Sequence, residues 1–249
     1  WRSLAGYSYQ YQGNPGGALT NIANANLSWE TSYTTNVALE FGFWDQRLYG
    51  TVEYFNRDSK DLLQDVPISK VTGFSSVLMN IGEINNKGVE IELGGDIIRN
   101  ANLTWDASVT ATLMKSKVTK LYDGQDIVWS DPTGSDARAD FIYREGESTL
   151  ALYGYEWAGV DPQTGKNWYY SNNDNADTQL NGRNVVYDYT DANNVIIGDV
   201  TPDVYGGINT SVTWKGLSLG LNFIYKIGGN LYDGAQKDVN DDGYYYERT

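Results

Sequence analysis

The chain has 249 residues, no cysteine and no histidine, and its 18 Lys and Arg against 32 Asp and Glu give a net charge of −14. Disulfides, thiolate metal sites, a Ser-His-Asp triad and a histidine-bearing zinc site therefore cannot be built from this chain alone. The negative charge would repel nucleic acid, so we expect no nucleic-acid partner. The sequence contains no run of about 18 apolar residues and predicts no transmembrane helix. A transmembrane β-barrel is still possible, because its strands need apolar residues only at alternate positions.

Six segments alternate apolar and polar residues with a period of two, which predicts β-strands with two unlike faces. In the last of them, Leu219, Leu221 and Phe223 alternate with Gly220 and Asn222. Each segment has about ten residues, the length that a tilted strand needs to cross a bilayer, whereas strands of soluble sandwiches usually have about 5–6. The six segments are Thr35–Phe43, Leu48–Phe55, Gly88–Ile97, Leu103–Leu113, Ile208–Trp214 and Leu217–Ile227.

Short and long connections alternate between these segments. The short ones are Asp45-Gln46, Arg99–Asn102 and Lys215-Gly216, and the long ones run from Asp58 to Ile84 and from Lys117 to Tyr205. Outer-membrane barrels have this asymmetry, with tight periplasmic turns and long outer loops. The pattern therefore favours an all-β, antiparallel transmembrane β-barrel over a soluble sandwich.

A tryptophan lies at or near each short turn: Trp44, Trp105 and Trp214. Such a placement predicts a ring of indoles at one membrane interface. The alternative is a set of core tryptophans in a sandwich.

Five segments resemble, in order, those of the SusC/RagA-type transporters. Asn24–Thr31 (NANLSWET) is similar to the family's N-P-x-L-K-W-E-T, with Ala25 and Ser28 in place of the usual Pro and Lys. Asn80–Leu93 (NIGEINNKGVEIEL) is close to N-x-G-x-[IV]-x-N-[KR]-G-[VI]-E and is the most specific match. The other three matching segments are Arg47–Leu63, Gly159–Gly165 (GVDPQTG) and Ile197–Phe223.

This resemblance implies a barrel of about 22 strands with a plugged lumen. We expect residues 1–249 to be part of one TonB-dependent receptor barrel domain, contributing about six strands with long extracellular loops, with the plug domain and the final strands absent from this chain. The resemblance also implies an outer-membrane location in a Gram-negative bacterium and import of oligosaccharides, or of peptides. The implied partners are a SusD-like surface lipoprotein and a TonB-type energy coupler that acts through the absent plug. No cofactor and no covalent chemistry are expected.

The segment from Lys117 to Tyr205 is the predicted contact region for substrate or partner. Flat aromatic rings suit sugar faces, and Tyr and Trp are enriched in interface hot spots. The alternative is a loop that packs on itself, and within it Ser171–Asn184 is predicted to be exposed. The candidate residues are Trp129, Tyr143, Tyr153, Tyr155, Trp157, Trp168, Tyr169 and Tyr170.

Carboxylates on the predicted lumen face raise a catalytic alternative. Glu90 and Glu92 lie two residues apart on one strand face and could be a glycosidase acid–base pair. A polar lumen needs such groups in any case, so we interpret them as wetting the barrel interior and pairing with basic groups of a plug. The lumen set is Glu40, Glu53, Glu90, Glu92, Asp96 and Asp106.

Two short motifs lie outside the predicted strands. Asp238, Asn240 and Asp242 match the start of a calcium loop, but Thr249 stands where the closing Glu would be, so an exposed acidic turn is the preferred interpretation. Asp161–Gly165 is predicted to be a simple turn. A soluble, secreted all-β glycan-binding module remains the alternative for the chain as a whole.

Overall fold

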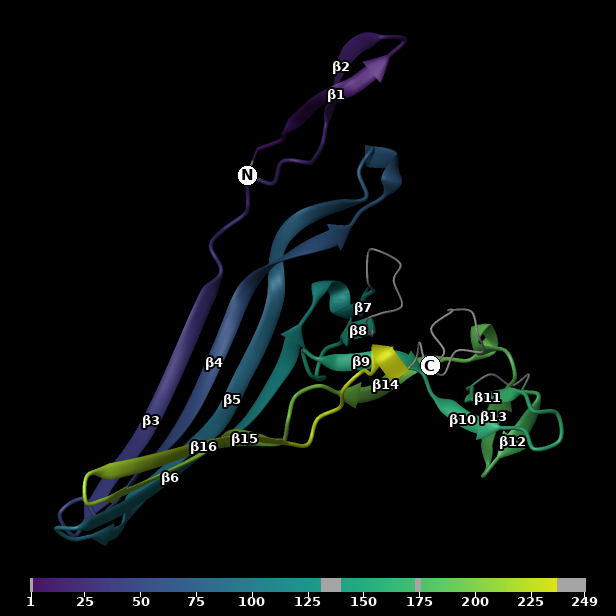
Figure 1. Cartoon of the computed structure of the whole chain (residues 1–249). Coiled ribbons are helices and arrows are strands. Elements are labelled where there is room, and N and C mark those ends of the chain that lie inside the picture. The colour runs from purple at the N-terminus through teal and green to yellow at the C-terminus, as the bar shows by residue number, and fades with distance from the viewer. Residues whose placement is uncertain (1, 131–139, 173–175, 237–249) are drawn as a thin grey trace.

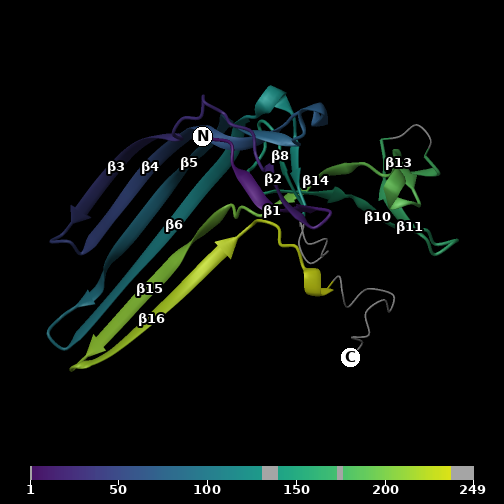
Figure 2. The same ribbon diagram turned by 90° about the horizontal axis from the view of Figure 1, so that it is seen from above.

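A computed structural model describes residues 2–130, 140–172 and 176–236. Its main feature is a six-stranded antiparallel sheet in the order β16-β15-β6-β5-β4-β3 (Figure 1). Figure 2 shows these strands side by side. The strands are β3 (Thr31–Phe43), β4 (Leu48–Pro67), β5 (Ser76–Arg99), β6 (Leu103–Lys120), β15 (Val204–Trp214) and β16 (Leu217–Ile227). All six predicted strands are present, and five of them extend beyond the predicted bounds.

The three short connections lie together at one end of the sheet, here called the turn end (Figure 1). Lys215 (φ 48°) and Gly216 (φ 90°) both have left-handed backbone, as a two-residue hairpin with the twist of its strands requires. Trp44, Asp45 and Gln46 also have positive φ. The far end carries the long connections, so the predicted alternation of short and long connections is confirmed.

Cross-strand register gives the sheet two unlike faces. Leu39 lies opposite Val52, Val52 opposite Ile91, and Ile91 opposite Ala111. The resulting apolar face is exposed: Leu219 is 62% exposed and Leu221 48%. Glu53, Glu90 and their neighbours fall on the other, polar face. Among the residues that the structure describes, therefore, no other element buries the apolar side chains of this part of the sheet.

Aromatic rings cover glycines in four directly opposed pairs. Phe55 lies opposite Gly88, where an added Cβ would come within 2.8 Å of the Phe55 ring. The Tyr225 hydroxyl crosses over Gly206 and donates to the Thr110 carbonyl (2.7 Å). The ring fills the space that a side chain would take, so these glycines are sites of close packing. The other two pairs are Phe41–Gly50 and Tyr49–Gly94.

The expected loop from Asp58 to Ile84 is wrong in its extent. β4 and β5 continue as a paired hairpin to Pro67 and Ser76, and a short 3-10 helix, η1 (Lys70–Thr72), lies near its tip. Two register shifts interrupt the pairing between Ser59 and Leu63. The apolar alternation covers only Leu48–Phe55 of β4 and Gly88–Ile97 of β5. The outer halves of both strands lack it, so the sequence does not predict them.

The expected loop from Lys117 to Tyr205 is likewise folded. β6 continues to Lys120, and two four-stranded sheets follow, in the orders β14-β9-β8-β7 and β10-β11-β13-β12. The 3-10 helix η2 (Tyr122–Gly124) lies between β6 and β7, and η3 (Tyr189–Asp191) joins the second small sheet to the first, between β13 and β14. The strands are β7 (Ile127–Trp129), β8 (Asp140–Tyr143), β9 (Ala151–Tyr155), β10 (Trp157–Val160), β11 (Asn167–Tyr170), β12 (Thr178–Leu180), β13 (Arg183–Val186) and β14 (Asn194–Asp199).

The buried apolar side chains lie in this far-end region and not between the turn-end halves of the strands. Ile142 and Val185 are fully buried, and Val66 and Val118 nearly so. Ser171, which was predicted to be exposed, is buried to 7% exposure, and β12 and part of β13 lie within Ser171–Asn184. The loop prediction is therefore wrong for Ser171 and for the strands, whereas most other described residues of this segment are exposed as predicted.

A separate hairpin, β1 (Ala5–Tyr11) with β2 (Asn14–Leu19), precedes the main sheet and lies beyond its far end (Figure 1). Across residues 2–130, 140–172 and 176–236, no helix is long and apolar enough to span a membrane.

Candidate functional site

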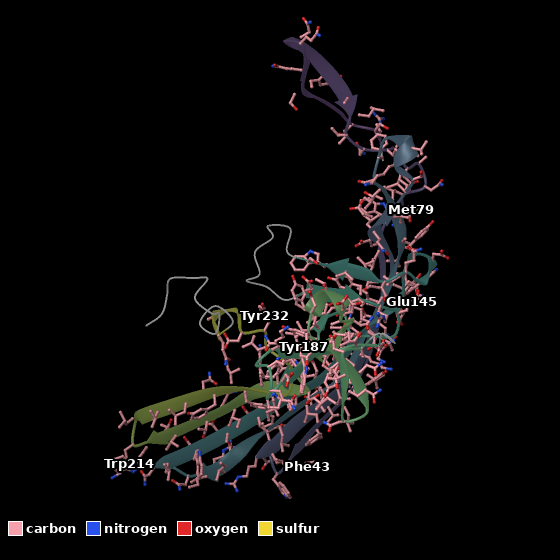
Figure 3. All side chains as sticks on the ribbon, turned by 90° about the vertical axis from the view of Figure 1, so that its right-hand side faces the viewer. Phe43, Met79, Glu145, Tyr187, Trp214 and Tyr232 are labelled. Atoms are coloured by element: carbon pink, nitrogen blue, oxygen red, sulfur yellow. The ribbon has the colours of Figure 1, made fainter. Side chains whose placement is uncertain are left out.

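The eight candidate aromatic residues all lie in the two far-end sheets, away from the turn end. Figure 3 shows Tyr187, which belongs to this region, well away from Phe43 and Trp214 at the turn end. Trp129, Tyr143, Tyr153 and Tyr155 come from the β7–β9 side, and Trp157, Trp168, Tyr169 and Tyr170 come from β10 and β11. The structure therefore separates the predicted set into two groups.

One face of the β10–β13 sheet carries Trp157, Tyr169 and Val186. Tyr169 lies directly opposite Trp157 on β10 and opposite Val186 on β13. The Trp157 side chain is 60% exposed, and its indole N–H donates to Asn167 Oδ1 at 3.4 Å. On this face the Trp157 indole is exposed to solvent, whereas Tyr169 is half-buried and Val186 is buried.

Tyr189 of η3 joins the two far-end sheets through its ring. Its centroid lies 5.5 Å from that of Tyr155 on β9 and 6.5 Å from that of Tyr169 on β11, both edge-to-face. Edge-to-face rings at this separation attract each other beyond their area of contact. Tyr189 was not among the predicted residues.

The opposite face of the same sheet carries Trp168, Tyr170, Tyr187 and Arg183. The Arg183 guanidinium lies 3.6 Å from the centroid of the Tyr170 ring, and the Trp168 ring lies 6.5 Å from that of Tyr187. The indole N–H of Trp168 is buried and has no hydrogen-bond partner among the described residues. A ligand oxygen could satisfy this donor if the sheet opened to admit it.

Arg183 is held in place by a two-pronged pair with Glu156. Its two terminal nitrogens donate to the two Glu156 carboxylate oxygens at 2.8 and 2.7 Å. These hydrogen bonds hold the pKa of Glu156 below its ordinary value and raise that of Arg183. Both side chains are partly exposed, so the pair fixes the orientation of the guanidinium more than it stabilises the fold.

The Asp161–Gly165 turn is built around a buried carboxylate. Asp161 is 5% exposed and accepts hydrogen bonds from the Thr164 hydroxyl (2.7 Å), the Gln163 amide (2.8 Å) and the Tyr187 hydroxyl (2.9 Å). These donors, Thr164 foremost, hold the pKa of Asp161 below its ordinary value. The turn prediction is confirmed, and the turn also anchors the Tyr187 ring.

The β7–β9 side is arranged differently. The rings of Trp129 and Phe141 lie 6.1 Å apart, and Tyr143 lines an apolar hollow of about 330 Å³ beneath β7 and β8. Arg144 donates to Asp126 Oδ2 from two nitrogens (2.9 and 2.6 Å), which raises the pKa of Arg144. The ring contact and the ion pair lie within the small sheet and its connections.

Sequence reasoning missed Phe141, Arg183, Tyr187 and Tyr189. Each meets a predicted aromatic residue only through strand pairing or through the placement of η3. Tyr187 and Tyr189 lie in the same predicted contact segment, so the aromatic content of that segment was the one signal that could have found them. Asp238, Asn240 and Asp242 of the possible calcium loop lie outside the described residues.

The predicted lumen carboxylates do share the polar face. Glu53 lies directly opposite Glu90, and Asp96 directly opposite Asp106. Like charges at opposed positions destabilise a sheet unless water or a basic group lies between them. Glu92 lies opposite Thr51. Glu90, Glu92 and Asp96 lie on one face of β5 and form a row of negative charge along that strand.

The fold defines a class of protein. Long antiparallel strands with an exposed apolar face, a polar opposite face, tight turns at one end and folded extensions at the other form the wall of a transmembrane β-barrel. Residues 1–244 match the protein family described as "TonB dependent receptor-like, beta-barrel". The chain therefore belongs to the TonB-dependent receptor family.

Similarity to individual proteins agrees with this family assignment. The chain is 33% identical to "TonB-dependent receptor P3" of Formosa agariphila over 87% of the chain and 22% of that protein. It is 36% identical to "TonB-dependent receptor SusC" of Bacteroides thetaiotaomicron over 41% of the chain and 10% of that protein. Among solved structures it is similar to the RagAB peptide transporter, with a TM-score of 0.74 and 28% identity over 91% of this chain and 24% of that one. The resemblance to SusC/RagA-type receptors is confirmed.

The chain spans between 22% and 25% of the length of three Formosa agariphila relatives that it matches. The six strands accordingly correspond to one stretch of a larger wall. Receptors of this class are outer-membrane transport proteins, and they are not a class of enzyme.

Proposed function

We propose that this chain is part of the wall and outer surface of a TonB-dependent active importer in the outer membrane of a Gram-negative bacterium. The importer takes up oligosaccharides, or peptides, and works with a SusD-like surface lipoprotein. Energy reaches it through a TonB-type coupler that acts on a plug. Membership of the family is established for the barrel, and the activity of the whole protein is what we propose.

The observation that carries the proposal is that the two halves of the long strands have different surfaces. The turn-end halves present an exposed apolar face, as lipid contact requires, and a row of carboxylates on the other face, as a water-filled lumen requires. The far-end halves carry sheets rich in tyrosine and tryptophan. A wall with an aromatic outer surface that could hold cargo suits import better than it suits a passive pore.

The aromatic surface of the β10–β13 sheet suits cargo or lid contact. Trp157 and Tyr169 share one face, and Trp168 and Tyr170 share the other. Flat rings pack against the apolar faces of sugars and against peptide side chains alike, so this surface serves either cargo. RagAB, which the chain resembles, is a peptide transporter. The aromatic surface does not separate the two cargoes, so both are tested.

Uptake by cells that carry the full-length protein tests the proposal. Trp157→Ala and Trp168→Ala should each reduce uptake of a labelled oligosaccharide mixture or of a labelled peptide mixture, and collapsing the proton gradient should abolish it. Val128→Ala is the matched control, because Val128 is 47% exposed on β7 and has no aromatic ring. Unaltered uptake in both tryptophan variants would remove their proposed role. Uptake that ignores the proton gradient would contradict active import.

The alternatives are less well supported. A soluble glycan-binding module would not expose Leu217, Leu219 and Phe223, which are 73%, 62% and 54% exposed along one strand face. A glycosidase would need Glu90 and Glu92 across a cleft, yet both project from one strand of the wall. Family membership favours their role in wetting the lumen.

A further inference from the structure

On the apolar face, the change from apolar to polar residues falls at one level across three neighbouring strands. Toward the far end, Tyr54 is followed on this face by Asn56, Val89 by Lys87, and Leu113 by Lys115. These polar residues are in register: Asn56 lies opposite Lys87, and Lys87 opposite Lys115. In a membrane barrel this line marks the upper boundary of the hydrocarbon band.

Lysines gather at this boundary without carboxylate partners. Lys87 and Lys115 are directly opposed, and Lys117 lies one step further out on the same face, opposite Asn85. All three are exposed, and none lies within 4.0 Å of a carboxylate among the residues that the structure describes. Directly opposed like charges destabilise an antiparallel pair, so the arrangement favours an anion between them.

The lysines border a hollow of about 490 Å³ that offers three kinds of contact. Its floor on the membrane side is apolar and includes Tyr54, Val89 and Leu113. Its side wall, where the chain runs along the edge of β6, contributes the carboxylate residues Glu147, Asp199 and Asp203. Glu147 is fixed there because its carbonyl accepts from the Val118 amide at 3.0 Å.

We propose that this hollow binds the headgroup of a phosphorylated glycolipid of the outer leaflet. Ammonium groups of Lys87 and Lys115 meet a headgroup phosphate, and the carboxylates of the side wall accept hydrogen bonds from sugar hydroxyls. The apolar floor receives the first methylenes of an acyl chain. A headgroup that joins phosphate, hydroxyls and acyl chains matches all three surfaces at once.

The position of the hollow separates it from the cargo site. Its floor and its lysines belong to the lipid-facing side of β4 to β6, whereas the aromatic surface of the β10–β13 sheet is a different element. The assignment to the outer leaflet rests on one part of the proposed function, namely that the long connections face the cell exterior.

Native mass spectrometry of the full-length protein tests the proposal, with diphosphorylated lipid A and its fully dephosphorylated form as the two probes. The unaltered protein should bind the phosphorylated probe more tightly. The double variant Lys87→Gln/Lys115→Gln should weaken that binding by roughly 30-fold, from about 1 kcal/mol for each lysine near a charged surface, and should leave the dephosphorylated probe unaffected. Lys215→Gln is the matched control, since Lys215 lies over the Trp214 ring at the turn end.

Equal binding of the two probes by the unaltered protein would overturn the proposal, and that measurement needs no variant. An unchanged affinity in the double variant would also overturn it. Displacement of the lipid by millimolar inorganic phosphate would show a site for free anions and contradict the lipid assignment. Lipid binding is scored without cargo or proton gradient, so its failure and a failure of import are distinguishable.

Discussion

The side chain of Asn80 forms a closed pair with the backbone of Ser28. The Ser28 amide donates to Asn80 Oδ1 at 2.9 Å, and Asn80 Nδ2 donates to the Ser28 carbonyl at 2.9 Å and to the Asp61 carbonyl at 2.7 Å. One amide thereby joins the segment that enters β3 to the outer halves of β4 and β5. The two most informative stretches of family resemblance, 24–31 and 80–93, meet at this contact.

Replacing Asn80 by Ala should loosen the entry to β3. The change removes three hydrogen bonds and leaves backbone groups of Ser28 and Asp61 to find water, which predicts a loss of roughly 1–3 kcal/mol in the free energy of unfolding. Urea unfolding of the full-length protein measures it, and faster amide exchange at residues 24–31 should accompany it. Asn26→Ala in the same segment is the control and should leave both quantities unaltered.

Gly206 should not tolerate a side chain. An added Cβ would overlap the Thr110 carbonyl and come within 2.8 Å of the Tyr225 hydroxyl. Gly206→Ala should therefore lower the free energy of unfolding by about 1–3 kcal/mol. Gly220→Ala on the neighbouring strand is the matched control, because nothing lies within 4 Å of its Cβ position. Equal stability of the two variants would contradict the packing described for Tyr225.

A charge on the apolar face should be costly only in the membrane. Leu221→Arg places a guanidinium in the hydrocarbon band and should destabilise the folded barrel in lipid by roughly 2–4 kcal/mol. Asn222→Arg, one residue along on the polar face, should cost little. Refolding yields into lipid vesicles would reveal the difference, and similar yields for both variants would argue against lipid contact at Leu221.

The Asp161 turn should weaken in acid. The folded-state pKa of Asp161 is lowered by its donors, so its contribution is present above the unfolded value of about 3.9 and is lost as the pH falls through the folded-state pKa. Amide exchange at residues 157–170, corrected for intrinsic rates, should therefore speed up below about pH 4. Asp161→Asn should show fast exchange already at pH 7 and little further change in acid. A variant that keeps the acid transition of the unaltered protein would assign that transition to another group.

The six main strands could be predicted because lipid and lumen impose strict alternation on them. Leu217–Ile227 has the same bounds in the sequence prediction and in β16. Beyond the membrane boundary the constraint disappears. The alternation used to predict β5 covered Gly88–Ile97, whereas the strand begins at Ser76. Pairing with β4 extends it, and pairing partners are not visible in a single strand's sequence.

The candidate site was predicted less completely for a related reason. Aromatic content identified the segment, and its strands of three to six residues were too short to give a periodic signal. Contacts such as Tyr155 with Tyr189 depend on how η3 returns to β9 across the whole segment. Trp105 and Trp214 do lie on the apolar face near the turn end, 37% and 55% exposed, while Trp44 lies within the turn itself.

The central claim is that one face of this sheet meets lipid and the other meets water. Because the chain contains no cysteine, single substitutions such as Leu221→Cys and Asn222→Cys can carry spin labels along β16 of the full-length protein in lipid vesicles. Collisions with oxygen, which concentrates in lipid, should be high at 219, 221 and 223, and collisions with a water-soluble nickel chelate should be high at 220 and 222. Uniform access of the nickel chelate to all five positions would contradict the account.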